Sequence, residues 1–184
     1  MHKDLKCILV GEEEIAGRVK ELGEEITRDY KDKNLLCVGI LNGSAVFMSD
    51  LIRKIKLPLR MEFMAASSYG SGSVSSGSVK ITRDLNFDIA GYDVLIVEDI
   101  IDTGVTLSYI KEMLWERNPR SVKIAAIFDK PARRRTELKA EYTGFTVPDE
   151  FIVGYGLDYD RRYRNLPYIG VLKPEIYSKD TPGV

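Results

Sequence analysis

Apolar runs of strand length alternate along this chain with amphipathic helical segments, and that alternation restricts the possible folds more than any other feature. Four mainly apolar runs predict buried strands: residues 35–41, 94–97, 122–128 and 151–153. Helices are expected over 12–30, 45–55 and 106–117, with a further strand over 59–65. This order predicts an α/β fold with a mainly parallel central sheet flanked by helices. Ligands of such sheets bind beyond the strand carboxyl ends, here after Leu41, Val97, Phe128 and Val153.

Scarce residue types exclude several kinds of site. The only histidine is His2, and the two cysteines are Cys7 and Cys37. A nucleophilic triad with an internal histidine and a zinc site of Cys and His ligands therefore both lack their residues. Cysteines without a pattern favour a reducing, cytoplasmic location. With 27 basic and 28 acidic residues the formal net charge is −1, which favours neither nucleic acid nor a membrane as partner.

We expect a single domain over residues 1–184, because the chain has neither an internal repeat nor an evident linker. One segment has a different composition: ten of the fourteen residues over 66–79 are Ser or Gly. Such a segment cannot bury much apolar area, and it predicts a mobile loop. The alternative, a disordered linker, is disfavoured inside one domain of this length.

Acidic side chains gather at the carboxyl end of the apolar run 94–97. Glu98 and Asp99 follow it directly, and Asp102 comes next. Four residues then open a helix whose free N–H groups and hydroxyls can bind a phosphate monoester: Thr103, Gly104, Val105 and Thr106. Carboxylates are useful beside a phosphate when they bind sugar hydroxyls, hold hydrated Mg²⁺ or act as a base. A simple helix cap at Asp102 or Thr103 explains one residue but not three acids.

The segment Val-Glu-Asp-Ile-Ile-Asp-Thr-Gly, residues 97–104, resembles the phosphoribosyl pyrophosphate signature of type I phosphoribosyltransferases, in the form of their hypoxanthine-guanine branch. Four further segments extend the resemblance over nearly the whole chain: residues 41–44, 68–70, 129–130 and 148–159, with Arg164 beyond them. The resemblance implies the type I phosphoribosyltransferase fold. Its core would be about 12–148, its hood about 1–11 and 149–184, and its mobile loop about 66–79, with Ser68 and Tyr69 at the root.

The implied reaction is the transfer of the 5-phosphoribosyl group from phosphoribosyl pyrophosphate to N9 of hypoxanthine or guanine, with Mg²⁺ as cofactor. By resemblance, Glu98 and Asp99 hold the ribose hydroxyls, directly or through Mg²⁺, and Asp102 exchanges a proton with the purine N7. The residues implied to bind the 5′-phosphate are Asp102, Thr103, Gly104, Val105 and Thr106. Those implied to bind the pyrophosphate are Leu41, Asn42, Gly43 and Arg164. The family commonly has lysine at the position of Asn42, so the backbone there carries the expected role.

The resemblance implies that four residues form the purine end of the site: Lys130, Phe151, Ile152 and Asp158. Lys130 would donate to O6, Phe151 would stack on the base, and the Ile152 backbone would contact the purine edge. Asp158 would join Glu98 and Asp99 as a metal ligand, at a second Mg²⁺. From the residues alone, Lys130 could equally be a surface lysine in the basic run that ends in Arg133, Arg134 and Arg135, which we interpret as solvated, and Phe151 could be a core residue.

Two other functions share this fold. A regulatory protein that binds RNA or DNA would need a basic face, which the net charge of −1 disfavours. A phosphoribosyltransferase for another base would lack the Asp-Lys and Phe-Ile-Val-Gly-Tyr-Gly-Leu-Asp elements. The resemblance therefore implies 6-oxopurines and phosphoribosyl pyrophosphate as substrates, and a homodimer or homotetramer as the assembly.

Overall fold

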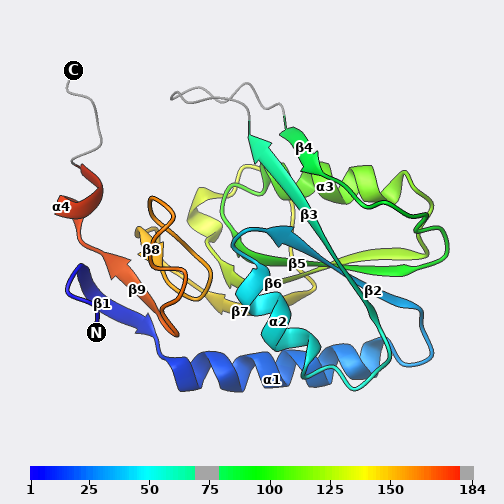
Figure 1. The fold of residues 1–184 in the computed structure, drawn as a ribbon, viewed down its shortest axis with the longest axis horizontal. Helices are drawn as coiled ribbons and strands as arrows, with labels where there is room; N and C mark the ends of the chain where they lie inside the picture. Colours follow the sequence, from blue (N-terminus) through cyan, green and yellow to red (C-terminus); the bar gives the residue numbers. More distant parts are fainter. Residues whose placement is uncertain (69–78, 179–184) are drawn as a thin grey trace.

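The computed structural model describes residues 1–68 and 79–178 (Figure 1). Most of the expected loop over 66–79, Tyr69 included, therefore lies outside the described residues. The first half of the chain contains β1 (Leu5–Val10), α1 (Glu12–Asp29), β2 (Leu35–Leu41), α2 (Ala45–Ile52), β3 (Arg60–Ser68) and β4 (Val79–Arg83). The second half contains β5 (Asp93–Ile101), α3 (Val105–Trp115), β6 (Ser121–Asp129), the short 3₁₀ helix η1 (Pro131–Arg133), β7 (Tyr142–Thr146), β8 (Ile152–Val153), β9 (Ile169–Leu172) and α4 (Pro174–Tyr177).

The larger sheet has the strand order β4-β3-β2-β5-β6-β7 within the described residues. β3, β2, β5, β6 and β7 are parallel, and β4 is an antiparallel edge strand. The predicted α/β architecture with a mainly parallel sheet is confirmed. No helix in the described part of the chain is long and apolar enough to span a membrane.

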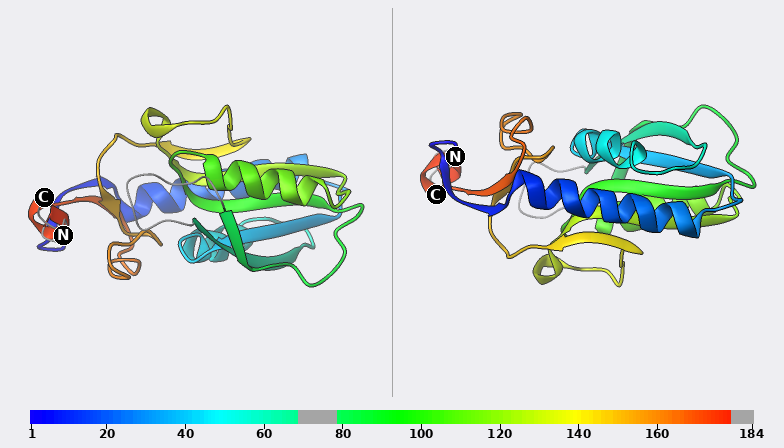
Figure 2. Two further views of the ribbon diagram at one scale, coloured as in Figure 1. Left: turned by 90° about the horizontal axis from the view of Figure 1, so that it is seen from above. Right: turned by 90° about the horizontal axis from the view of Figure 1, so that it is seen from below.

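Helices cover both faces of this sheet, with α1 and α2 on one side and α3 on the other (Figures 1 and 2). Successive strand residues point to opposite faces. Cys37 and Leu95 accordingly belong to the core under α1 and α2, whereas Val38 and Ile96 belong to the core under α3. Burial on both faces explains why these strands are uninterrupted apolar runs, and each fully buried aliphatic side chain stabilises the fold by about 1.5–3 kcal/mol.

The first helix follows directly from its sequence spacing. Ile15, Val19, Leu22 and Ile26 are all buried along one stripe of α1. At its start, the Glu14 carboxylate accepts a hydrogen bond of 2.8 Å from the Gly11 N–H. The predicted second helix, 45–55, is too long by three residues. It ends at Ile52, and just beyond it the Lys54 N–H donates to the Leu51 carbonyl at 2.9 Å, the tighter i→i−3 bond that is common at helix ends.

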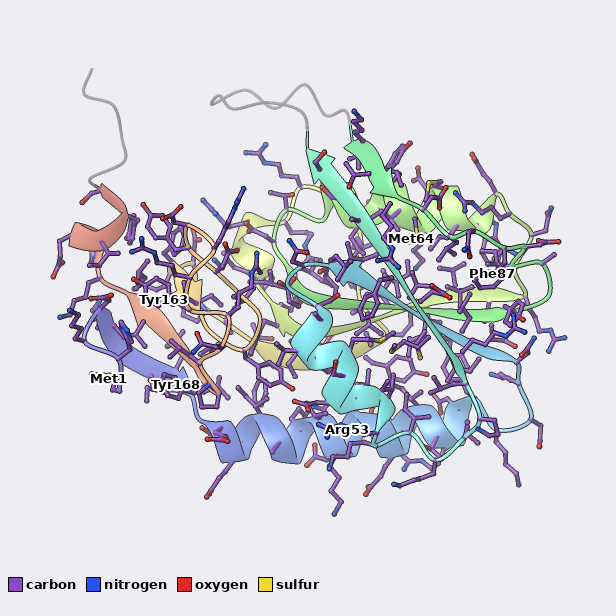
Figure 3. All side chains as sticks on the ribbon, in the orientation of Figure 1. Met1, Arg53, Met64, Phe87, Tyr163 and Tyr168 are labelled. Atoms are coloured by element: carbon purple, nitrogen blue, oxygen red, sulfur yellow. The ribbon has the colours of Figure 1, made fainter. Side chains whose placement is uncertain are left out.

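A second, antiparallel sheet joins the two ends of the chain in the order β1-β9-β8. It lies at one end of the molecule, beside the N-terminus and α4 (Figure 2). Tyr163 and Tyr168 tie it to the first residues (Figure 3): the Tyr163 hydroxyl donates to Asp4 at 2.8 Å, and the Tyr168 hydroxyl accepts from the His2 N–H at 3.1 Å.

The predicted strand over 151–153 is only partly correct. Its observed form, β8, starts at Ile152 and belongs to the small sheet, so it is not a fourth buried strand of the main sheet. The edge position next to β6 is taken by β7, whose sequence Tyr-Thr-Gly-Phe-Thr contains no apolar run that would predict a strand. Because one face of an edge strand can stay polar, β7 does not need such a run.

Candidate active site

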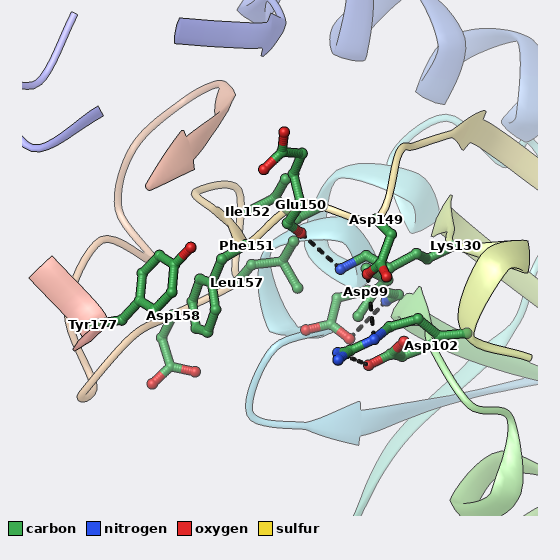
Figure 4. Close-up of a pocket in the computed structure, with 12 residues that line it drawn as sticks. Asp99, Asp102, Lys130, Asp149, Glu150, Phe151, Ile152, Leu157, Asp158 and Tyr177 are labelled. Carbon is green, nitrogen blue, oxygen red and sulfur yellow. Dashed lines mark hydrogen bonds and ion pairs between the residues drawn. The ribbon is translucent and has the colours of Figure 1, made fainter. Parts of the chain in front are cut away.

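A cleft of about 530 Å³ separates the carboxyl ends of β5 and β6 from the small sheet (Figure 4). It is lined by predicted site residues from distant parts of the chain: Asp99, Asp102, Lys130, Phe151, Ile152 and Asp158. A second pocket of about 140 Å³ shares Ile100 and Asp102 with it and is lined by Glu98, Thr103, Gly104 and Thr106. The geometry thus brings the acidic strand end, the helix start and the base-binding candidates together around Asp102.

Glu98 and Asp99 are half-buried neighbours at the end of β5. The Asp99 N–H donates to Glu98 Oε1 at 3.1 Å, and the Ile100 N–H donates to Asp99 Oδ1 at 2.7 Å. Burial raises the pKa of both carboxyl groups, and the adjacent Asp99 raises the pKa of Glu98 further. A cation or sugar hydroxyls placed at this pair would favour the ionised carboxylates.

This acidic pair fits a magnesium ion that is shared with a substrate. Mg²⁺ is usually bound through one or two carboxylates together with water and substrate phosphates. Within residues 1–68 and 79–178, no three His, Cys, Asp or Glu side chains form a complete metal site. An ion bound at Glu98 and Asp99 would therefore need further ligands from the substrate or from water.

The start of α3 has the geometry of a phosphate-binding turn. Gly104 has a φ of 80°, in the left-handed region that favours glycine. A Cβ at this position would lie 2.5 Å from Thr136 Oγ1 and 3.0 Å from Arg134 Cδ, so the close packing also requires glycine. The N–H groups of the first helical turn have no partner within the helix, and Thr103, Gly104 and Thr106 at this turn line the smaller pocket.

The basic run that ends in Arg133, Arg134 and Arg135 is not simply the solvated surface that the sequence predicted. Arg134 is only 14% exposed and forms an ion pair with Asp129. Its guanidinium also donates to the backbone carbonyls of Asp102, at 3.2 Å, and Ile101, at 3.4 Å. The prediction fails because β6 ends directly beside the loop between β5 and α3, so that Arg134 lies against that loop instead of in solvent.

The two carboxylate oxygens of Asp102 lie in different surroundings. Oδ2 faces Arg133 Nη1 at 3.4 Å, and Arg133 Nε in turn contacts Asp149 Oδ1 at 3.2 Å. Oδ1 is buried and has no hydrogen-bond partner among the described residues. A buried acceptor without a donor is unfavourable in the free protein, and a donor from a ligand would relieve that cost.

Lys130 is buried, with only 6% of its surface exposed, so the interpretation as a surface lysine is wrong. Its Nζ donates to the Glu150 carbonyl at 2.8 Å, which holds the ammonium group at the cleft. Phe151 lies outside the core, with 38% of its surface exposed, and it stacks on Tyr177. Ile152 is buried in β8.

The loop after β2 packs tightly between two other parts of the site. The Leu41–Asn42 peptide bond is cis. A Cβ on Gly43 would lie 1.5 Å from Asp99 Oδ2, and a Cβ on Gly156 would lie 2.1 Å from the Gly43 carbonyl oxygen. Both glycines are therefore required by the close approach of three chain segments.

Arg164 connects this loop region to Asp158. Its Nη2 lies 2.8 Å from Asp158 Oδ1, and its Nη1 donates to the Gly156 carbonyl at 2.5 Å. The charge of Arg164 also acts to lower the pKa of Asp99, against the larger effect of burial. Arg164 thus lies near the pyrophosphate-loop candidates through Gly156, which packs against Gly43. Arg134, Gly156 and Tyr177 are the site neighbours that sequence reasoning did not single out, and only the glycine-rich composition around residue 156 could have indicated one of them.

Comparison with known proteins places this chain in a well-defined family. The phosphoribosyl transferase domain family matches residues 10–160. The chain is 54% identical to the hypoxanthine-guanine phosphoribosyltransferase of Bacillus subtilis, covering 96% of this chain and 98% of that protein. The crystal structure of a hypoxanthine phosphoribosyltransferase from Staphylococcus aureus matches with a TM-score of 0.93 and 54% identity over 96% of both chains.

A longer relative shares the same domain. The bifunctional protein TilS/HprT of Listeria monocytogenes is 54% identical over 179 residues, and the chain spans only 28% of its length. The match to shorter relatives, by contrast, is nearly complete on both sides. The fold, the arrangement of the cleft and these similarities together show that the chain belongs to the hypoxanthine-guanine phosphoribosyltransferase family.

Proposed function

We propose that this protein transfers the 5-phosphoribosyl group of phosphoribosyl pyrophosphate to N9 of hypoxanthine, guanine or both, releasing pyrophosphate. The reaction belongs to purine salvage and is a pentosyl transfer. The observation that supports it most is a pair of pockets that meet at Asp102, one lined by Lys130 and Phe151 and the other by the acidic strand end and the helix start, in a chain of this family.

The acidic and glycine-rich elements would bind the sugar and its phosphates. The N–H groups and hydroxyls over Thr103–Thr106 hold the 5′-phosphate, as helix N-termini do. Glu98 and Asp99 bind the ribose hydroxyls, and their negative charge stabilises the positive charge that develops on the sugar. The backbone of Leu41, Asn42 and Gly43, together with Arg164, binds the departing pyrophosphate.

The residues present also fit the proposed cofactor. Glu98 and Asp99 would hold one Mg²⁺ and Asp158 a second, and the metal would neutralise the negative charge on the pyrophosphate. Burial raises the pKa of Glu98 and Asp99, and a cation bound beside them would favour their ionised forms.

The purine end would set the choice of base. An ammonium group has three donors, so Lys130 can keep its bond to Glu150 and still donate to O6. Phe151 stacks on the base, and the backbone of Ile152 contacts its edge. As N9 forms its bond to the anomeric carbon and the bond to pyrophosphate breaks, the N7 proton passes to Asp102.

A panel of bases tests the proposal. The protein is incubated with phosphoribosyl pyrophosphate, Mg²⁺ and, in separate reactions, hypoxanthine, guanine, xanthine and adenine. We expect nucleotide from hypoxanthine or guanine and little from adenine, and failure to convert any 6-oxopurine would overturn the proposal. Lys130→Ala should lower the preference for the 6-oxo group, measured as kcat/KM for hypoxanthine divided by kcat/KM for adenine.

Asp102→Asn separates proton transfer from phosphate binding. Losing a positioned general base costs about 10²–10⁴-fold in rate, so kcat should fall by that much while calorimetric binding of phosphoribosyl pyrophosphate survives. Loss of binding without a separate loss of turnover would instead assign Asp102 to phosphate positioning.

The expected homodimer or homotetramer is tested by light scattering, and the expected cytoplasmic location by fractionation of the producing cells.

A further inference from the structure

The ring of Phe151 is stacked on a second aromatic ring from the C-terminal helix. The Tyr177 and Phe151 centroids are 4.9 Å apart, and the ring planes differ by 19°. Tyr159 meets Phe151 edge-on, with the centroids 5.5 Å apart and the planes at 87°. Offset stacking and edge-to-face contacts are the two favourable geometries for aromatic pairs. Phe151 is therefore held on two sides although it lies at the surface of the cleft.

The arrangement of these rings points toward the cleft. In Figure 4 the Phe151 ring lies between the Tyr177 ring and the group formed by Lys130, Asp99 and Asp102. Tyr177 thus covers the face of Phe151 that is turned away from Lys130. The opposite face is turned toward the cleft, and both rings line it. A planar base stacked on that open face would be the third layer of a Tyr177–Phe151–base stack.

The backbone fixes Tyr177 in this position. The Leu172 N–H donates to the Phe151 carbonyl at 2.8 Å, so the end of β9 is bonded directly to the residue whose ring is stacked. The Lys173 N–H then donates to the Asp4 carbonyl at 3.0 Å, and α4 begins at Pro174. Tyr177 also packs against the small core formed by Leu5, Val153 and Leu172. Its ring is placed by the sheet and not by a free tail.

We infer that Tyr177 is a positioning residue for the purine base: it stacks on Phe151 and thereby fixes the ring on which the base binds. The inference rests on the proposed function and deepens it, because it extends the base site to the C-terminal helix. Tyr177 does not touch the reacting atoms. Its removal should weaken base binding while leaving the sugar, phosphate and proton-transfer groups in place.

Steady-state kinetics of four variants test this inference. Tyr177→Ala should raise the KM for hypoxanthine about 3- to 10-fold, the effect of losing one aromatic stack, with the KM for phosphoribosyl pyrophosphate and kcat within about twofold of wild type. Tyr177→Phe keeps the stack and should restore the wild-type KM. Tyr177→Leu fills the space without a flat ring and should behave like Tyr177→Ala. Tyr109→Ala, which removes an exposed tyrosine of α3, should change nothing.

The outcomes distinguish the alternatives. An unchanged KM for hypoxanthine in Tyr177→Ala overturns the inference. A purely structural role is shown, and the inference overturned, if Tyr177→Leu restores the wild-type KM or if both substrates are affected equally. Absence of turnover in the wild-type protein overturns the proposed function, and the inference falls with it.

Discussion

Replacing Gly43 by alanine is the sharpest perturbation that the geometry of the site offers. The new Cβ would lie 1.5 Å from Asp99 Oδ2 and 2.5 Å from its Cγ. The two groups must separate by about 1.9 Å to reach an ordinary contact of 3.4 Å. Asp99 is restrained by the bond from the Ile100 N–H, and the Gly43 carbonyl packs against Gly156 on the other side. Neither the carboxylate nor the loop can yield without disturbing the site.

The expected magnitude follows from this displacement. Overpacking of a well-packed region destabilises a protein by about 1–3 kcal/mol, which a domain of ordinary stability survives. Misplacement of a reacting group by about 1 Å can reduce the rate about 10²-fold. Gly43→Ala should therefore fold, lose about 1–3 kcal/mol in the free energy of unfolding and lose at least about 10²-fold in kcat/KM.

A matched substitution controls for the change itself. A Cβ on Gly17, in the middle of α1, meets nothing within 4 Å. Gly17→Ala should keep wild-type kinetics and gain about 0.5–1 kcal/mol of stability from helix propensity. Urea unfolding and the kinetics of nucleotide formation measure both variants. The reasoning is refuted if Gly43→Ala retains more than about a third of the wild-type kcat/KM.

Three further predictions follow from side chains outside the reacting groups. Arg134→Ala should lower kcat and destabilise the protein by about 1–3 kcal/mol, because it removes the side-chain donor to the Asp102 carbonyl beside the site and leaves Asp129 without its ion-pair partner; kinetics and urea unfolding check this, and unchanged kcat would contradict it. The Arg117 guanidinium lowers the pKa of Asp84 in the folded protein, so their pair stabilises the fold above the unfolded pKa of about 4 and is lost as the pH falls further. Asp84→Asn should accordingly cost at most about 1 kcal/mol near neutral pH, since the pair is exposed, and progressively less as the pH is lowered below about 4, as urea unfolding over a series of pH values would show. Burial raises the pKa of Cys37 to about 12, so iodoacetamide at pH 8 should modify the partly exposed Cys7 first and Cys37 only after unfolding, as mass spectrometry would show.

The sequence predicted the main sheet well because its strands are buried on both faces. An apolar run such as 35–41 has few other stable placements than the centre of a parallel sheet. The small sheet was harder to predict, because β8 and β9 are short and pair with β1 from the opposite end of the chain. No local pattern encodes a pairing over such a distance.

The candidate site shows the same division between local and long-range information. The acidic strand end and the helix start around Asp102 are contiguous in the sequence, so their chemistry could be read directly. Arg134 and Tyr177 carry no local signal, since their contacts are made with the loop after β5 and with Phe151. The packing of Gly43 against Asp99 likewise depends on three segments that meet only in the fold.

Product analysis of a single reaction tests the central claim most directly. Purified protein is mixed with hypoxanthine, phosphoribosyl pyrophosphate and MgCl₂, and the products are separated by chromatography. The account predicts inosine monophosphate and pyrophosphate in equal amounts, and neither product when a chelator removes the magnesium. Unchanged hypoxanthine in the complete mixture would contradict it.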